Sequence, residues 1–287
     1  MLNGCYKVVR SEINFIEPEN VAYNLGPLFL PENPFFSSIS INYFTPTPLP
    51  TKVLFTMVGD IDWLREEKSL KNFHRMTFSD LEENAVYRFE YFSRNEQKKG
   101  LIKTLPYGSE YEFSFCITSL EYGVKSQNPP SFTIVVSKES LLRFEDFVDF
   151  YERNKDFLSS TIFLPVFNVS YQNKNLFAGN GEKISCSYYK DVRIICIRER
   201  LNDYDCIASF IPTINKAGTH IIAGNIGKDD VYLISKKFSP FVEKIFVYKD
   251  SYVEAEKVVS IDSPIFITVS RDSKYAINLK MQLSKLP

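Results

Sequence analysis

The spacing of apolar residues changes partway along this chain of 287 residues, and that change restricts the fold more than any other feature. Before Pro106, short segments alternate apolar and polar residues with a period of two, which is typical of strands with one buried face. After Gly108, the apolar segments are nearly continuous, which is typical of strands buried on both faces. We therefore predict two domains that divide between residues 107 and 108, because 287 residues accommodate two domains of ordinary size.

The first domain, residues 1–107, is predicted to be an immunoglobulin/fibronectin III-like β-sandwich with an N-terminal extension to about residue 34, because short strands follow one another without a long helix. Leu81 precedes Tyr87 across a polar turn, which is similar to the tyrosine corner of such sandwiches. We expect the Tyr87 hydroxyl to bond backbone a few residues upstream, with plain core packing as the alternative. The prolines of 46–50 predict a turn or a sheet edge. Strands are expected at 38–45, 51–58, 72–78, 85–93 and 98–106.

The second domain, residues 108–287, mixes apolar strands with helix and is predicted to be α/β or α+β. Its clearest helix spans 139–158, where apolar residues recur on one face and Ser137 or Ser140 is in place to cap the first turn. Strands are expected at 111–117, 131–136, 162–169, 220–224, 243–248, 264–270 and 274–283, with a hairpin over 184–197 that turns at Lys190-Asp191.

Composition excludes several classes of function. The chain has 34 Lys and Arg against 35 Asp and Glu, a balance that argues against nucleic-acid binding. Its two histidines, His74 and His220, nearly exclude a His-rich metal centre. Five cysteines, an odd number, indicate reduced thiols in a cytoplasmic protein, with a Cys196–Cys206 disulfide as the alternative. No apolar run has the length of a signal-peptide core or a membrane span, so we expect neither.

Two segments carry a resemblance to a known family. FHRMTFSDLEENAVYRFEYFS (73–93) and LIKTLPYGSEYEFSFCITSLEYG (101–123) are similar to the end of the sandwich and the entry into the catalytic domain of purple-acid-phosphatase-like metallophosphoesterases. The resemblance covers roughly 35–283 and lies in element order and apolar patterning. It implies a fibronectin-like sandwich followed by a calcineurin-like α/β sandwich of two mixed sheets with flanking helices.

The family's metal ligands are absent from the matching strand ends. In the family, Asp, Asn and His side chains at these ends hold two metal ions that activate a water. Here a lysine stands at two of the positions, where its ammonium repels a divalent cation and can take the space of a metal. The replacing residues are Ser119, Lys138, Asn173, Asn225, Lys249 and Ser251, with Tyr171, Asp250 and Tyr252 as expected neighbours in the former cleft.

These replacements lead us to expect a catalytically inactive metallophosphoesterase homologue that acts by binding, with no catalytic residue, metal or cofactor. The expected partner is a protein, a polysaccharide or a small anion held by Lys138 and Lys249. One alternative is a divergent phosphoesterase or other hydrolase with a relocated or single-metal site. The other is a structural protein that self-associates, and the oligomeric state is left open.

Other motifs receive structural interpretations. Gly59-Asp60 looks like a metal motif, but we interpret it as a turn between strands. His74 is expected on a sandwich strand, half-exposed. The remaining carboxylates with metal-ligand chemistry are interpreted as solvated loop residues, and they are Asp203, Asp205, Asp229 and Asp230.

Overall fold

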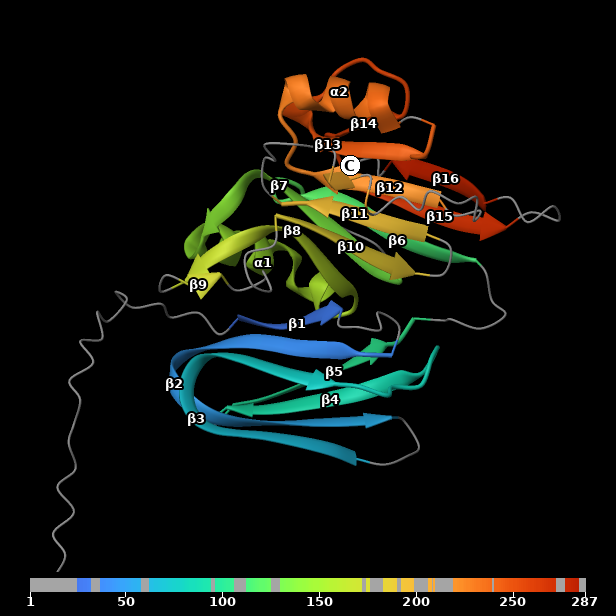
Figure 1. The fold of residues 1–287 in the computed structure, drawn as a ribbon. Coiled ribbons are helices and arrows are strands. Elements are labelled where there is room, and N and C mark those ends of the chain that lie inside the picture. The colour runs from blue at the N-terminus through green and yellow to red at the C-terminus, as the bar shows by residue number, and fades with distance from the viewer. Residues whose placement is uncertain are drawn as a thin grey trace, which may run out of the picture.

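The structure is a computed structural model, and it shows a mostly β protein in which two mixed sheets stack on each other (Figure 1). Two α-helices are present among the described residues, and neither is long and apolar enough to cross a membrane. The structure describes residues 25–31, 37–57, 62–93, 96–105, 112–124, 130–171, 174–175, 183–189, 192–198, 206–207, 209, 219–238, 240–271 and 277–283.

Five strands and one helix build the mixed half of the larger sheet. They are β6 (Phe113–Ser119), β7 (Phe132–Arg143), α1 (Phe144–Leu158), β8 (Ile162–Tyr171), β15 (Ile265–Arg271) and β16 (Ile277–Leu283). β6, β7 and β8 run parallel, and α1 connects β7 to β8. β15 pairs antiparallel with β6 and β16. The continuously apolar sequences of β6 and β8 follow from burial on both faces, as predicted.

The N-terminal strands belong to the same sheet. They are β1 (Leu25–Pro31), β2 (Ile39–Met57), β3 (Asp62–Phe78), β4 (Val86–Ser93) and β5 (Glu96–Lys103). β2 pairs with β3 along one edge, and with β1 and then β4 along the other. β1 also pairs in parallel with β8, so it joins the antiparallel strands to the mixed half of the sheet.

The smaller sheet has five strands and its own helix. Its elements are β10 (Ile184–Tyr189), β11 (Val192–Ile197), β12 (Thr219–Gly224), α2 (Lys228–Phe238), β13 (Lys244–Tyr248) and β14 (Val258–Ile261). β10 and β11 form the predicted antiparallel hairpin, whose turn at 190–191 lies outside the described residues. β11, β12, β13 and β14 run parallel, and α2 connects β12 to β13. Two short elements complete the fold, β9 (Lys174–Asn175) beside β8 and the 3₁₀ turn η2 (Lys249–Ser251) after β13.

Three clusters of buried apolar side chains hold these layers together. The first lies between the sheets, where Phe115 of the larger sheet and Ile194 of the smaller sheet belong to one core. The second packs Phe147 and its neighbours on α1 against the outer face of the larger sheet. The third packs Val231 and its neighbours on α2 against the outer face of the smaller sheet. The order of layers is therefore helix, sheet, sheet, helix, as Figure 1 shows around β7, β11 and β13.

The predicted tyrosine corner is confirmed. Tyr87 and Leu81 are buried, and the Tyr87 hydroxyl accepts a hydrogen bond of 2.8 Å from the backbone N–H of Glu82. The bond fixes the polar turn before β4 against the strand that follows it. This is the upstream backbone contact that the spacing of Leu81 and Tyr87 predicts.

Two local predictions are wrong. The prolines of 46–50 do not end a strand, because β2 continues through them with shifts of register against β3, and bulges are positions where a strand tolerates proline. The helix predicted over 139–158 begins only at Phe144, since the residues before it still pair with β8. Its N-cap residue is Arg143, without a side-chain cap bond, so neither Ser137 nor Ser140 has the predicted role.

Five of the described elements, β1, β9, α2, η2 and β14, have no counterpart among the predicted segments. The four cysteines that the structure describes are free thiols, so the alternative Cys196–Cys206 disulfide is not formed. The proposed boundary between residues 107 and 108 lies among residues outside the described part of the chain, and the division into two domains stays a prediction.

Candidate functional site

The carboxyl ends of β6, β12 and β13 and a bulge in β7 meet at one edge of the two stacked sheets. Parallel strands present their carboxyl ends at the same edge, and open α/β sheets bind ligands there. Hydrogen bonds and ion pairs between the two sheets join these ends. We call this region the strand-end edge, and its side chains come from the residues just after these strands and from a bulge in β7.

The bulge in β7 spans residues 137–140. Val136 of β7 pairs with Val166 of β8, and the next pairing joins Leu141 to Asn168. β7 therefore advances five residues while β8 advances two, which leaves three extra residues in β7. Bulges of this kind redirect side chains next to functional sites. The bulge carries Lys138 away from the regular ladder.

Lys138 links the two sheets across the strand-end edge. Its backbone carbonyl accepts a 2.7 Å hydrogen bond from the side-chain amide of Asn225, the residue after β12. Its ammonium lies 2.8 Å from a carboxylate oxygen of Asp250, in the turn after β13. Both contacts attach the β7 bulge to the smaller sheet.

A second set of contacts joins the end of β6 to the end of β13. The ammonium of Lys249 lies 2.8 Å from one carboxylate oxygen of Glu121, and the Tyr248 hydroxyl donates a hydrogen bond to the other. Arg153 of α1 holds the turn that carries Glu121, because its guanidinium donates to the carbonyl oxygens of Leu120 at 3.0 Å and Glu121 at 3.4 Å. Glu121 is thereby positioned from both sheets and from the helix.

The contacts at this edge favour the charged forms of its ion pairs. The hydrogen bond from Lys249 is the main cause that lowers the pKa of Glu121, and the bond to Glu121 raises the pKa of Lys249 in return. The hydrogen bond between Lys138 and Asp250 raises the pKa of the lysine and lowers that of the carboxyl. Burial, followed by the bond to Glu121, raises the pKa of Tyr248. At neutral pH the edge therefore holds two ammonium–carboxylate pairs and a neutral phenol.

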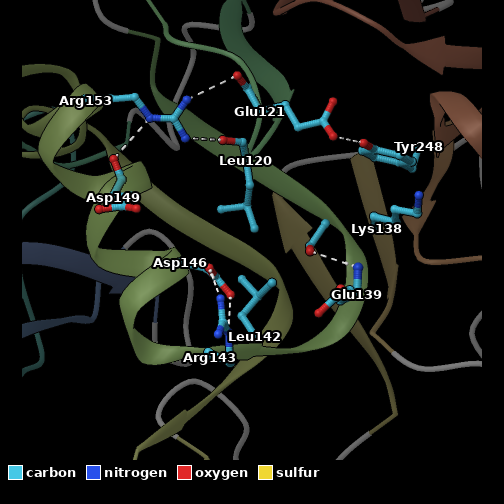
Figure 2. Close-up of a pocket in the computed structure, with 11 residues that line it drawn as sticks. Leu120, Glu121, Lys138, Glu139, Leu142, Arg143, Asp146, Asp149, Arg153 and Tyr248 are labelled. Carbon is cyan, nitrogen blue, oxygen red and sulfur yellow. Dashed lines mark hydrogen bonds and ion pairs between the residues drawn. The ribbon is translucent and has the colours of Figure 1, made fainter.

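A groove of about 680 Å³ lies beside this edge, between the β7 bulge and α1 (Figure 2). Its lining carries both signs of charge, and each of its cations has a partner. Lys138 pairs with Asp250, Arg143 makes a two-pronged contact with Asp146 at 2.9 and 3.0 Å, and Arg153 donates to backbone carbonyls. Since these cations already have partners, the groove does not present a ready-made site for an anion.

The structure brings together three of the six positions that the resemblance matched to metal ligands, namely Lys138, Asn225 and Lys249. Ser119 ends β6 and is fully buried, and its hydroxyl has no hydrogen-bond partner among the described residues. Ser251 ends η2 and is half-buried. The sixth position, Asn173, lies outside the described residues. Of the expected neighbours, Asp250 pairs with Lys138, Tyr252 is exposed, and Tyr171 ends β8 with its side chain outside the described part.

The side chains of this edge do not fit the two metal ions of the family. Lys138 and Lys249 are cations, and the two carboxylates beside them, Glu121 and Asp250, are each engaged by one of these ammoniums. Within the part of the chain that the structure describes, no three His, Cys, Asp or Glu side chains gather into a group that could hold a metal.

Glu121, Tyr248 and Arg153 are site residues that sequence reasoning missed. Glu121 lies in the turn directly after β6, and Tyr248 is the last residue of β13. A glutamate and a tyrosine next to the positions expected for metal ligands carry no signal of their own in the sequence. Arg153 lies within the predicted helix, and only the fold shows that it reaches the turn after β6.

A second polar cluster lies between β2 and β3, and it corrects the prediction for His74. This histidine is fully buried instead of half-exposed, because its ring stacks on Tyr43 with centroids 4.9 Å apart. One ring nitrogen lies 2.8 Å from a carboxylate oxygen of Glu67, and the other lies 3.2 Å from the Thr45 hydroxyl. Burial lowers the pKa of His74 against the opposing influence of Glu67. The period-two pattern of β3 does not reveal which face a polar residue takes.

The other residues with ligand chemistry do not gather at a common site. Asp229 and Asp230 lie in the first turn of α2, where carboxylates suit the helix N-terminus, so they are helical instead of loop residues. His220 lies inside β12, as predicted, and is buried. Gly59-Asp60, Asp203 and Asp205 lie outside the described residues.

No protein-family model matches the chain. No curated protein matches it either. A solved structure described as "Structure of PhoD" is 10% identical at a TM-score of 0.47, and the match covers 78% of this chain and 69% of that one. The sensor domain of the anti-sigma factor RsgI4 from Pseudobacteroides cellulosolvens is 14% identical at a TM-score of 0.22, over 28% of this chain and 97% of that one. These TM-scores are too low to define a family.

Proposed function

We propose that this chain is a non-catalytic relative of metallophosphoesterases that acts by binding at its strand-end edge. One observation carries the proposal: ammonium groups take part in both ion pairs at this edge, Lys138 with Asp250 and Lys249 with Glu121. In a metallophosphoesterase the same edge supplies anionic and imidazole ligands to two cations. Here the positive charge comes from the chain itself.

Coulomb's law supports a site that excludes metal. A divalent ion placed near Glu121 or Asp250 would face an ammonium within a few ångströms and would have to displace it. The lysine pKa values are raised, so deprotonation near neutral pH does not free the carboxylates. Each carboxylate therefore keeps its lysine, and a hydrolytic metal centre does not form on these residues.

The carboxylates give no support to a relocated hydrolytic site. A general acid needs a raised carboxyl pKa. The pKa is instead lowered in each described carboxyl that has a resolved shift, namely Glu67, Glu121, Asp146 and Asp250. Two ligand classes remain for the edge, a segment of a partner protein and a polysaccharide. The amide groups of a protein and the hydroxyl groups of a sugar are neutral and can hydrogen-bond to a lining of paired charges. A small anion is the least supported ligand, because the lysines are engaged.

Metal content and hydrolysis test the proposal together. Protein purified without chelator is analysed for bound metals by mass spectrometry, then assayed with phosphate monoesters and diesters in the presence of added Mn²⁺, Zn²⁺ or Mg²⁺. We expect no stoichiometric metal and no turnover above buffer. Two tightly bound ions together with turnover would contradict the proposal. A titration with inorganic phosphate, followed by calorimetry, is expected to give no heat of binding, and a tight phosphate site would restore the small anion as the ligand.

A further inference from the structure

The β7 bulge follows directly on the pairing of Val136 with Ser119, the last residue of β6, and is attached to the smaller sheet through Asn225 and Asp250. We propose that residues 137–140 form a strap that opens at the strand-end edge and uncovers two buried polar side chains, Ser119 and Asn168. The inference rests on the proposed function in treating this edge as the binding site. The test of the strap does not involve metals or hydrolysis. The experiments can therefore contradict the opening of the strap without contradicting the proposed function, or contradict the proposed function without contradicting the opening.

The side chains of Ser119 and Asn168 are buried and find no hydrogen-bond partner in the part of the chain that the structure describes. Their exposed fractions are 0% and 1%, and the hydroxyl of Ser119 and both polar atoms of the Asn168 amide have no hydrogen-bond partner among the described residues. Buried polar groups in folded proteins are nearly always bonded, because an unpaired one loses its bonds to water and gains none in return. The closed arrangement is therefore unfavourable at these two residues, and opening relieves it.

Both side chains face the space between the two sheets. In β6, Phe115 and Ile117 belong to the core between the sheets, and Ser119 follows on the same face because side chains alternate along a strand. In β8, Val166 belongs to that core, and Asn168 continues its face. The strap leaves the sheet between these two residues, since the last pairing before it is level with Ser119 and the first pairing after it involves Asn168.

The contacts that hold the strap to the smaller sheet are exposed. The side chains of Lys138 and Asp250 are 64% and 51% exposed, and ion pairs in such positions are weak because water competes for both groups. The amide of Asn225 adds one hydrogen bond to the strap backbone. On either side of the strap, the paired residues of β7 and β8 form a regular parallel ladder. Within the strap, Ser137 is buried and accepts a 3.1 Å hydrogen bond from the backbone N–H of Glu139, so opening breaks the two contacts to the smaller sheet and uncovers Ser137, while the strands beside the strap stay in place.

Thiol labelling with an internal control tests the strap. The variant Ser119→Cys places a small thiol at the covered position, and Cys116 lies on the same strand, fully buried and facing α1. Timed alkylation with N-ethylmaleimide, followed by mass spectrometry, gives a separate rate at each position. We expect the thiol introduced at 119 to react at least about tenfold faster than Cys116, because local opening exposes only the former.

Substitution of the residues that attach the strap to the smaller sheet tests whether these contacts control the labelling. In the background of Ser119→Cys, the double change Lys138→Met and Asn225→Ala is expected to raise the labelling rate at 119 by about tenfold or more and to leave Cys116 unchanged. Arg143→Met is the matched control, because it breaks the exposed pair with Asp146 on the same groove without touching the strap. Equal labelling rates at 119 and 116 would contradict the opening of the strap. A double variant that changes neither rate, or raises both, would contradict it as well.

A second measurement covers the case in which Ser119→Cys does not fold. Hydrogen exchange followed by mass spectrometry, on the natural chain and on Lys138→Met with Asn225→Ala, reports the amides of the strap directly. Faster exchange confined to a peptide over 137–141 supports opening. Unchanged exchange there, or faster exchange throughout the sheet, contradicts it.

Discussion

Two clusters of polar and charged side chains in this molecule share a contact distance and differ in burial. At the strand-end edge, Lys249 and Glu121 lie 2.8 Å apart with 42% and 45% of their side chains exposed. Between β2 and β3, His74 and Glu67 also lie 2.8 Å apart, but the histidine is 0% and the glutamate 18% exposed. Water screens the first pair and not the second, so equal distances correspond to unequal contributions to stability. We expect the buried cluster to hold the fold together and the exposed one to be free to open.

The largest effect is expected from His74→Ala. The substitution removes a ring stacked on Tyr43 and leaves the Glu67 carboxylate without that partner, so we expect a loss of about 3 kcal/mol in the free energy of unfolding. Urea denaturation measures it. Thr77→Ala, at an exposed position on the same strand, is the control and is expected to change little. A loss no larger than that of the control would break the comparison.

A smaller effect is expected from Tyr87→Phe. The ring stays, and only the hydroxyl that accepts the bond from Glu82 N–H is lost, so we expect a loss of about 1 kcal/mol. The same denaturation experiment measures the change. An unchanged midpoint would show that water or another group replaces the hydroxyl.

The dependence of stability on pH distinguishes the buried cluster from the exposed one. The pKa of His74 in the folded chain is below its ordinary value of about 6.5, mainly because of burial, so protonation favours the unfolded chain. Its contribution to stability is complete above that ordinary value and is lost as the pH falls through the lowered folded pKa. Denaturation midpoints measured from about pH 8 to about pH 5 are expected to fall for the natural chain and to fall less for His74→Gln. Parallel curves would argue against this contribution.

The smallest effect is expected at the strand-end edge. Lys249→Met and Glu121→Gln each break the exposed pair, and we expect no resolvable change in the denaturation midpoint for either one, in low or high salt. A loss as large as that of His74→Ala would show that the edge is part of the stabilising core. It would also argue against a strap that opens there.

The layers of the fold could be predicted from hydrophobic patterns, and the connections between them could not. Continuous apolar runs identified β6 and β8, and helical spacing identified α1, because burial on two faces or on one helical face leaves a clear mark on the sequence. β14 was missed because it has only four residues, and β1 because glycine and proline interrupt its apolar pattern. β2 was divided at its prolines because a bulge inside a long strand looks the same in sequence as a turn between two strands. Parallel pairing of β1 with β8 depends on contacts far apart in the chain.

The sequence indicated where in the fold these residues lie, but not which side chains contact one another. Lys138, Asn225 and Lys249 were singled out because element order assigned them to strand ends, and the structure places them side by side. Their partners were not foreseen, since the choice of Glu121 or Asp250 by a lysine depends on the bulge in β7 and on the turn after β13. Patterns of polar residues do not encode such geometry.

The position of β1 has a consequence for any attempt to divide this protein. β1 is the first strand in sequence but lies between β2 and β8 in space. A truncated chain that starts after residue 107 would lack this strand and would expose the backbone of β8 as an open edge. Open edges of buried, apolar strands recruit other chains. The second half produced alone is therefore expected to aggregate. A peptide of Leu25–Pro31 added to it is expected to pair with β8 and to reduce the aggregation.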